Sequence, residues 1–126
     1  MSRKILIIED DDNLRTQLAE YLSLKGGYQV EEAEDGLKGL EKLKNEPFDL
    51  VITDITMPYI SGIGIITILK RENPDIPVVA ITGYGAEVEN LAQEKEADAV
   101  LSKPIETEKM LKLLEGLISK GGKNGS

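Results

Sequence analysis

The feature that most constrains the fold is a series of short apolar runs, separated by longer stretches in which apolar residues recur at helical spacing. Three runs, at residues 5–8, 49–53 and 76–81, are rich in β-branched residues, which is typical of strands buried on both faces. Weaker strands are expected at residues 28–33 and 97–101. Because parallel sheets covered by helices contain strands of this kind, the pattern predicts an α/β protein.

The intervening stretches predict the helices that cover the sheet. Apolar residues at helical spacing, bounded by capping or helix-ending residues, occur at residues 12–25, 36–45, 61 or 62 to 72 and 106–119, and a polar, poorly patterned helix is expected at residues 86–96. Asp11 or Asp12 can cap the first helix, and Gly26-Gly27 can end it. Five strands alternating with five helices through right-handed crossovers predict a three-layer α/β sandwich. One domain, residues 1–120, is expected, with residues 121–126 as a flexible tail.

The residues that follow the strands indicate where a functional site lies. In a parallel α/β sheet, ligands bind beyond the carboxyl ends of the strands. The first strand is followed by Glu9, Asp10 and Asp11, the third by Asp54, the fourth by Thr82-Gly83 and the fifth by Ser102-Lys103-Pro104. We therefore expect the carboxylates of Glu9, Asp10 and Asp54, the Thr82 hydroxyl and the Lys103 ammonium group to meet at one edge of the sheet.

Composition excludes several other kinds of function. The 126 residues include no cysteine and no histidine, which rules out disulfides, thiol nucleophiles and a phosphohistidine. The net charge of −8, with no basic patch, argues against direct nucleic-acid binding. No apolar run is long enough to cross a membrane, and no secretory segment precedes the first strand, so a cytoplasmic protein is expected.

The expected edge cluster suits phosphoryl transfer. Glu9, Asp10 and Asp54 would repel one another unless a hard divalent cation lay between them, and oxygen ligands suit Mg²⁺. A carboxylate can act as the nucleophile and form an acyl phosphate, while Lys103 and Thr82 can neutralise and hydrogen-bond the phosphoryl oxygens. Without a histidine to activate water, the product is expected to persist, which indicates a stored signal more than turnover.

Four blocks of sequence carry a resemblance to a known family. They are Ile5 to Asp11, Phe48 to Pro58, Val78 to Thr82 and Leu101 to Pro104. In this order and spacing they resemble the motifs of the response-regulator receiver domain (CheY-like) of two-component signalling, over residues 4 to about 119. The resemblance implies a flavodoxin-like, doubly wound fold with strand order 2-1-3-4-5.

The resemblance also implies a role for each site residue. Asp54 would accept a phosphoryl group from a phosphohistidine on a sensor kinase or a histidine phosphotransfer protein. Asp10 would bind Mg²⁺ directly, together with Asp54 and the backbone carbonyl of Thr56, and Glu9 would contribute, often through water. Thr82 would be the switch hydroxyl and Lys103 the phosphate-pairing lysine. Structural roles are implied for a cis Lys103–Pro104 bond, for Pro58 and for Gly62, which would close the turn after Asp54.

The chain departs from the family pattern at two positions. Glu9 stands where the family more often has aspartate, and Val100 stands where most members carry tyrosine or phenylalanine. Valine cannot swing inward as that aromatic does, so Tyr84, two residues after Thr82, is the alternative candidate for reporting the switch. The resemblance implies that Thr56 and Tyr84 tune the lifetime of the acyl phosphate.

Other functions and the partners were also considered. A degenerate receiver that acts as a docking module is one alternative. A haloacid-dehalogenase-type phosphohydrolase would need a second aspartate where Thr56 stands, and an FMN binder would need a phosphate loop in place of the acids at 9–12. The resemblance implies that Leu14, Arg15 and Leu18 help to dock the kinase. The unphosphorylated chain is expected to be a monomer that catalyses only its own phosphorylation and slow dephosphorylation.

Overall fold

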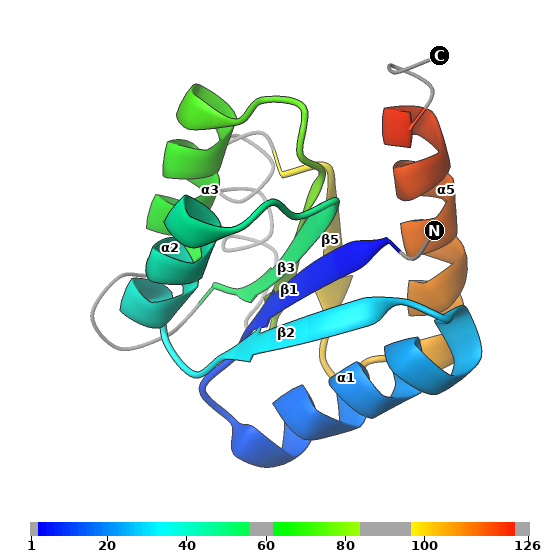
Figure 1. Ribbon diagram of the computed structural model, residues 1–126. Coiled ribbons are helices and arrows are strands. Elements are labelled where there is room, and N and C mark those ends of the chain that lie inside the picture. The colour runs from blue at the N-terminus through cyan, green and yellow to red at the C-terminus, as the bar shows by residue number, and fades with distance from the viewer. Residues whose placement is uncertain (1–2, 56–61, 84–96, 123–126) are drawn as a thin grey trace.

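The computed structural model describes residues 3–55, 62–83 and 97–122, and Figure 1 shows their arrangement. The strands are β1 (Lys4–Ile8), β2 (Gln29–Ala33), β3 (Leu50–Asp54), β4 (Val78–Thr82) and β5 (Ala99–Ser102). The helices are α1 (Asp12–Gly26), α2 (Gly36–Asn45), α3 (Gly62–Glu72) and α5 (Thr107–Gly122). The expected helix at residues 86–96 lies outside the described residues.

All five strands form one parallel sheet in the order β2-β1-β3-β4-β5. This confirms the predicted fold class, and the predicted strands agree with the observed ones to within two residues at each end. The longest apolar runs became the central strands β1, β3 and β4, because a central strand is covered by helices on both faces.

The two faces of the sheet bury two separate apolar clusters. Figure 1 shows α1 and α5 on one face and α2 and α3 on the other. Ile5 and Ile7 of β1 pack toward α1 and α5, whereas Leu6 and Ile8 pack toward α2 and α3. This alternation follows from the two-residue period of a strand, so every residue of β1 after Lys4 is buried.

The ends of α1 are set by the residues that the sequence singled out. The Asp11 carboxylate accepts the N–H groups of Asn13 at 3.0 Å and Leu14 at 3.1 Å, which makes it the N-cap. Gly27 ends the helix in the left-handed conformation with φ 71°, which glycine adopts without steric cost. Asp11 therefore starts the helix directly after the acids of the first strand end.

The last helix is longer than expected. It begins at Thr107 and continues to Gly122, so it includes two residues of the segment that was expected as a tail. Its buried side chains Met110, Leu114 and Ile118 recur every four residues and pack on the face of the sheet that α1 also covers.

Candidate phosphoryl-transfer site

The carboxyl ends of four neighbouring strands bring the predicted residues together. Asp54 ends β3 beside Ile81, and Thr82 ends β4 beside Ser102. Carboxylate oxygens of Glu9, Asp10 and Asp54 all lie within 4.8 Å of one another. The predicted convergence of these residues on one edge is therefore confirmed.

One lysine connects the acids. The Lys103 ammonium donates to Asp54 Oδ2 at 2.8 Å and lies 3.3 Å from Glu9 Oε1. The Lys103 N–H donates to the Thr82 carbonyl at 2.8 Å, and the Lys103–Pro104 bond is cis, as the resemblance implies. The backbone thus places the Lys103 side chain over the end of β4 and toward β3.

Burial differs sharply among the three acids. Glu9 is 0% exposed and Asp54 is 4% exposed, while Asp10 is exposed. Thr82, the expected switch hydroxyl, is also fully buried. Of the three acids, Asp10 is thus the one that is open to solvent.

Burial also changes the ionisation of Glu9 and Lys103. Loss of hydration raises the pKa of Glu9 to about 8, and the neighbouring Asp54 carboxylate adds to the effect, while the N–H of Asp11 opposes it. For Lys103, loss of hydration lowers the pKa, but the hydrogen bond to Asp54 and the charges of Asp54 and Glu9 outweigh it and raise the pKa overall. The environment therefore favours the charged form of Lys103 and disfavours the ionised form of Glu9.

The residues present fit a divalent cation. Glu9 Oε2 accepts the Asp11 N–H at 3.1 Å, but Glu9 Oε1 is buried without a hydrogen-bond partner in the described part of the chain. Buried carboxylate oxygens without a partner are costly, and a metal ion is one of the ways in which proteins satisfy them. Three carboxylates around one ammonium group also leave negative charge that a divalent ion would balance.

Gly62 makes the close approach at this edge possible. Its N–H donates to the Ile55 carbonyl at 2.8 Å, at the point where α3 begins. A Cβ atom at position 62 would lie 2.1 Å from the Asp54 carbonyl oxygen and 2.7 Å from the Ile55 Cα, so only glycine fits. The expected role of Gly62 in closing the turn after Asp54 is thus confirmed.

Several predicted residues have a different or undescribed setting. Thr56, Pro58 and Tyr84 lie outside the described residues. Val100 is half-buried and packs against the apolar cluster on the α2 and α3 side of the sheet. Pro104 is exposed.

The expected docking face on α1 is wrong in one respect. Leu18 is 1% exposed and belongs to the core, so it cannot contact a partner protein. Leu14 is half-buried, and the Arg15 side chain is 13% exposed and hydrogen-bonded within the chain. The helical period pointed to an apolar face, but only the packing shows that this face is turned toward the sheet. The inward role of Arg15 was missed, since its acceptor Glu32 is brought near it only by the fold.

The fold and the site together define a CheY-like phosphoacceptor domain. The family model for the response regulator receiver domain matches residues 5–115, which is most of the chain. The chain therefore belongs to the response-regulator receiver family and is a phosphoacceptor module of two-component signalling. This result selects the receiver over the phosphohydrolase and FMN-binding alternatives.

Individual relatives agree with the family match. The response regulator receiver protein CpdR of Brucella abortus is 35% identical over 117 residues, which cover 92% of this chain and 97% of that protein. Other curated relatives are longer, and the chain spans 28% to 51% of their length.

Solved structures show the same fold at similar length. A CheY-like receiver domain protein from Methanospirillum hungatei superposes with a TM-score of 0.92 at 27% identity, covering 98% of this chain and 99% of that one. The response regulator TrrA from Thermotoga maritima, solved in complex with Mg²⁺ and BeF, has a TM-score of 0.83 at 30% identity, covering 91% and 98%. In the described residues of our chain, no helix is long and apolar enough to cross a membrane.

Proposed function

We propose that Asp54 is the residue that accepts the phosphoryl group, from a phosphohistidine on a sensor histidine kinase or a histidine phosphotransfer protein. The observation that carries this proposal is the position of the Asp54 carboxylate, which is nearly buried between two acids and the Lys103 ammonium at 2.8 Å. A carboxylate in this position has a cationic partner ready for the incoming phosphoryl oxygens.

Glu9, Asp10 and Asp54, with the backbone carbonyl of Thr56, are the groups that we expect to hold Mg²⁺. The cluster of three carboxylates, and the buried Glu9 Oε1 that has an ion pair with Lys103 but no hydrogen bond in the described residues, support the first three of these. When bound, the metal would supply positive charge for the phosphoryl oxygens. The longer side chain of Glu9 reaches into the cluster from a buried position, which distinguishes it from the exposed Asp10.

The transfer itself needs little from the protein beyond position and charge. An oxygen of Asp54 attacks phosphorus, the bond between phosphorus and the imidazole nitrogen breaks, and its electron pair stays on that nitrogen; the imidazole leaves neutral when its other nitrogen already carries a proton, and otherwise takes up a proton from water. Lys103 pairs with the phosphoryl oxygens, and Thr82 donates its hydroxyl hydrogen to one of them. Since the 126 residues include no histidine, the most common general base for activating water is missing.

The aspartyl phosphate would change the protein contacts of the chain. Thr82 would move toward the phosphoryl group, and we expect Tyr84 to report this movement because Val100 is too small to swing as an aromatic does. Thr56 and Tyr84 would tune the lifetime of the phosphate. Under this proposal the chain catalyses only its own phosphorylation and slow dephosphorylation, and is a monomer before phosphorylation.

Intact-mass measurement tests the proposal directly. We expect one phosphoryl group to be gained from a small phosphodonor with Mg²⁺, and none after removal of the metal or in Asp54→Asn. Asp75→Asn is the matched control, because Asp75 is exposed near the opposite edge of the sheet and should leave the gain intact. A gain that survives Asp54→Asn would overturn the assignment. The absence of any gain in the wild type would favour a degenerate receiver that acts by docking.

A further inference from the structure

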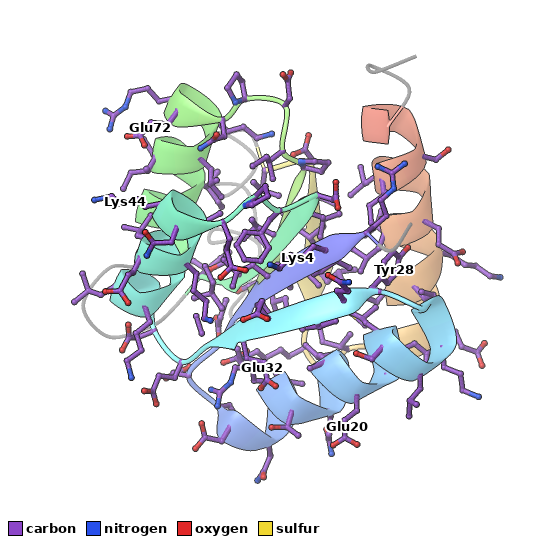
Figure 2. All side chains as sticks on the ribbon, viewed as in Figure 1. Lys4, Glu20, Tyr28, Glu32, Lys44 and Glu72 are labelled. Atoms are coloured by element: carbon purple, nitrogen blue, oxygen red, sulfur yellow. The ribbon has the colours of Figure 1, made fainter. Side chains whose placement is uncertain are left out.

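The Arg15 side chain joins the loop after β1 to the neighbouring strand β2. Its Nη1 donates to the Glu9 carbonyl at 2.7 Å, and its Nε donates to Glu32 at 3.1 Å. Its Nη2 donates to Asp12 at 2.7 Å. Glu32 is labelled in Figure 2, on β2 above the first half of α1. Each of the three guanidinium nitrogens therefore donates a hydrogen bond within the chain.

The contact with Glu9 has a direct consequence for the site. The Glu9 carbonyl belongs to the peptide group that joins Glu9 to Asp10, and a peptide group is planar. On its other side, the Glu9 N–H donates to the Ala33 carbonyl at 3.0 Å. The backbone on both sides of Glu9 is thus anchored, which limits the directions in which the Glu9 and Asp10 side chains can leave it.

We propose that Arg15 is a positioning residue, which orients the Glu9–Asp10 peptide group and thereby sets the affinity of the acidic cluster for a divalent cation. The inference rests on the proposed function, since it concerns the same metal site. Residues that hold metal ligands in place commonly change metal affinity by 10- to 100-fold when they are replaced.

The chemistry of the arginine supports this role over that of a docking residue. The side chain is 13% exposed, so little of it is available to a partner protein. The planar guanidinium holds its N–H groups in fixed directions, whereas a lysine ammonium is a single point charge on a flexible stem. Arginine can therefore hold Glu9, Asp12 and Glu32 from three separate nitrogens, whereas lysine presents its three N–H donors from a single nitrogen.

A matched pair of ion pairs on β2 makes the inference testable. Glu31 and Glu32 are neighbours, so their side chains leave opposite faces of the sheet. Glu32 binds Arg15 of α1, and Glu31 binds Lys42 of α2 at 2.9 Å. Lys42→Met therefore removes a comparable ion pair from the same strand without touching the loop after β1.

The experiment is a calorimetric titration of the metal-free protein with Mg²⁺ alone, for wild type and variants. We expect Arg15→Met to raise the Kd for Mg²⁺ about tenfold, Arg15→Lys to raise it less, and Lys42→Met to leave it unchanged. Thermal unfolding in EDTA separates this effect from a loss of folding. If Arg15→Met does not fold, Glu32→Gln is titrated instead, and a severalfold rise in Kd is expected because Arg15 loses a charged anchor.

The outcomes separate this inference from the proposed function. A wild type that does not bind Mg²⁺ would contradict the metal site itself. If the wild type binds Mg²⁺ and the folded Arg15→Met variant binds it with the same Kd, the positioning role would be overturned. The same holds for Glu32→Gln where it replaces Arg15→Met. A docking role alone would slow phosphotransfer from a phosphohistidine protein, but leave both the Kd for Mg²⁺ and the reaction with a small phosphodonor unchanged. That outcome would also overturn the inference.

Discussion

The edge of the sheet at the amino ends of the strands (the amino edge) and the edge at their carboxyl ends (the carboxyl edge) differ in how their charged residues are paired. At the amino edge, Asp49 and Asp98 each have both a backbone and a cationic partner: the Asp49 carboxylate accepts the Lys4 N–H at 2.7 Å and lies 3.8 Å from Arg3. There too, Asp98 accepts both the Val78 N–H and the Lys70 ammonium at 2.7 Å. At the carboxyl edge, three carboxylates lie together, and Lys103 pairs with two of them, Glu9 and Asp54.

The difference shows which charges hold the fold together and which serve the site. Charged side chains that are paired and also hydrogen-bonded to the backbone join neighbouring strands. Their partial burial costs little stability, because each charge keeps a partner. A cluster of like charges around a partly satisfied glutamate costs stability, and proteins keep such clusters where function requires them. In the described residues, the carboxyl edge is therefore where like charges lie together at a cost in stability, in contrast to the paired charges of Asp49 and Asp98.

The largest expected effect comes from filling the space beside Asp54. Gly62→Ala places a Cβ atom 2.1 Å from the Asp54 carbonyl oxygen, and backbone cannot give way as a flexible side chain does. We expect a loss of about 4 kcal/mol or more in the free energy of unfolding, measured by urea denaturation.

Gly116→Ala is the control for that substitution. Nothing lies within 4 Å of a Cβ atom built at Gly116, which is inside α5. Alanine favours a helix over glycine by about 1 kcal/mol, so a small gain in stability is expected. An equal effect at both positions would contradict the close approach at the site.

The next effect is a dependence of stability on pH that only the carboxyl edge produces. The pKa of Glu9 is about 8 in the folded chain and 4.5 without the fold, so the folded state binds the extra proton between these values. The free energy of unfolding without metal therefore falls as pH rises from about 4.5 to about 8.

Unfolding measured across this pH range, with EDTA or with Mg²⁺, tests the assignment. Glu9→Gln should remove most of the slope, since its amide does not titrate, and Mg²⁺ should flatten the slope by binding the ionised form. The opposite result would be a free energy of unfolding in EDTA that rises with pH in the wild type but not in Glu9→Gln. It would show that the fold stabilises the charged form of Glu9, contrary to the structure.

A smaller effect is expected at the amino edge. Asp98→Ala leaves the Val78 N–H and the Lys70 ammonium without their shared acceptor, which should cost about 2 kcal/mol in the free energy of unfolding. Because Asp98 is at the far end of the sheet, the Kd for Mg²⁺ should stay at its wild-type value. A coupled loss of metal affinity would show that the two edges do not act independently.

Much of the site could be predicted because its residues follow the strands. Asp54 and Thr82 are the last residues of β3 and β4, and Lys103 comes directly after β5. A parallel sheet places such residues at one edge whatever the details of packing. Leu18 shows the limit of this reasoning, because a helical repeat does not say whether a given apolar side chain meets the core or a partner.

The sequence by itself determined the elements, the α/β class and the edge at which the acids collect, since apolar period, caps and strand ends are local properties of the chain. Only the tertiary structure decided which charges pair. Lys103 meets Asp54 across 49 positions, and Arg15 meets Glu32 across 17. Burial of Glu9 likewise depends on the surrounding layers. The partners and the hydration of a charged side chain are set by elements that are distant in sequence. The energy of each charge depends on its distance from other charges and on its burial, which no local sequence pattern contains.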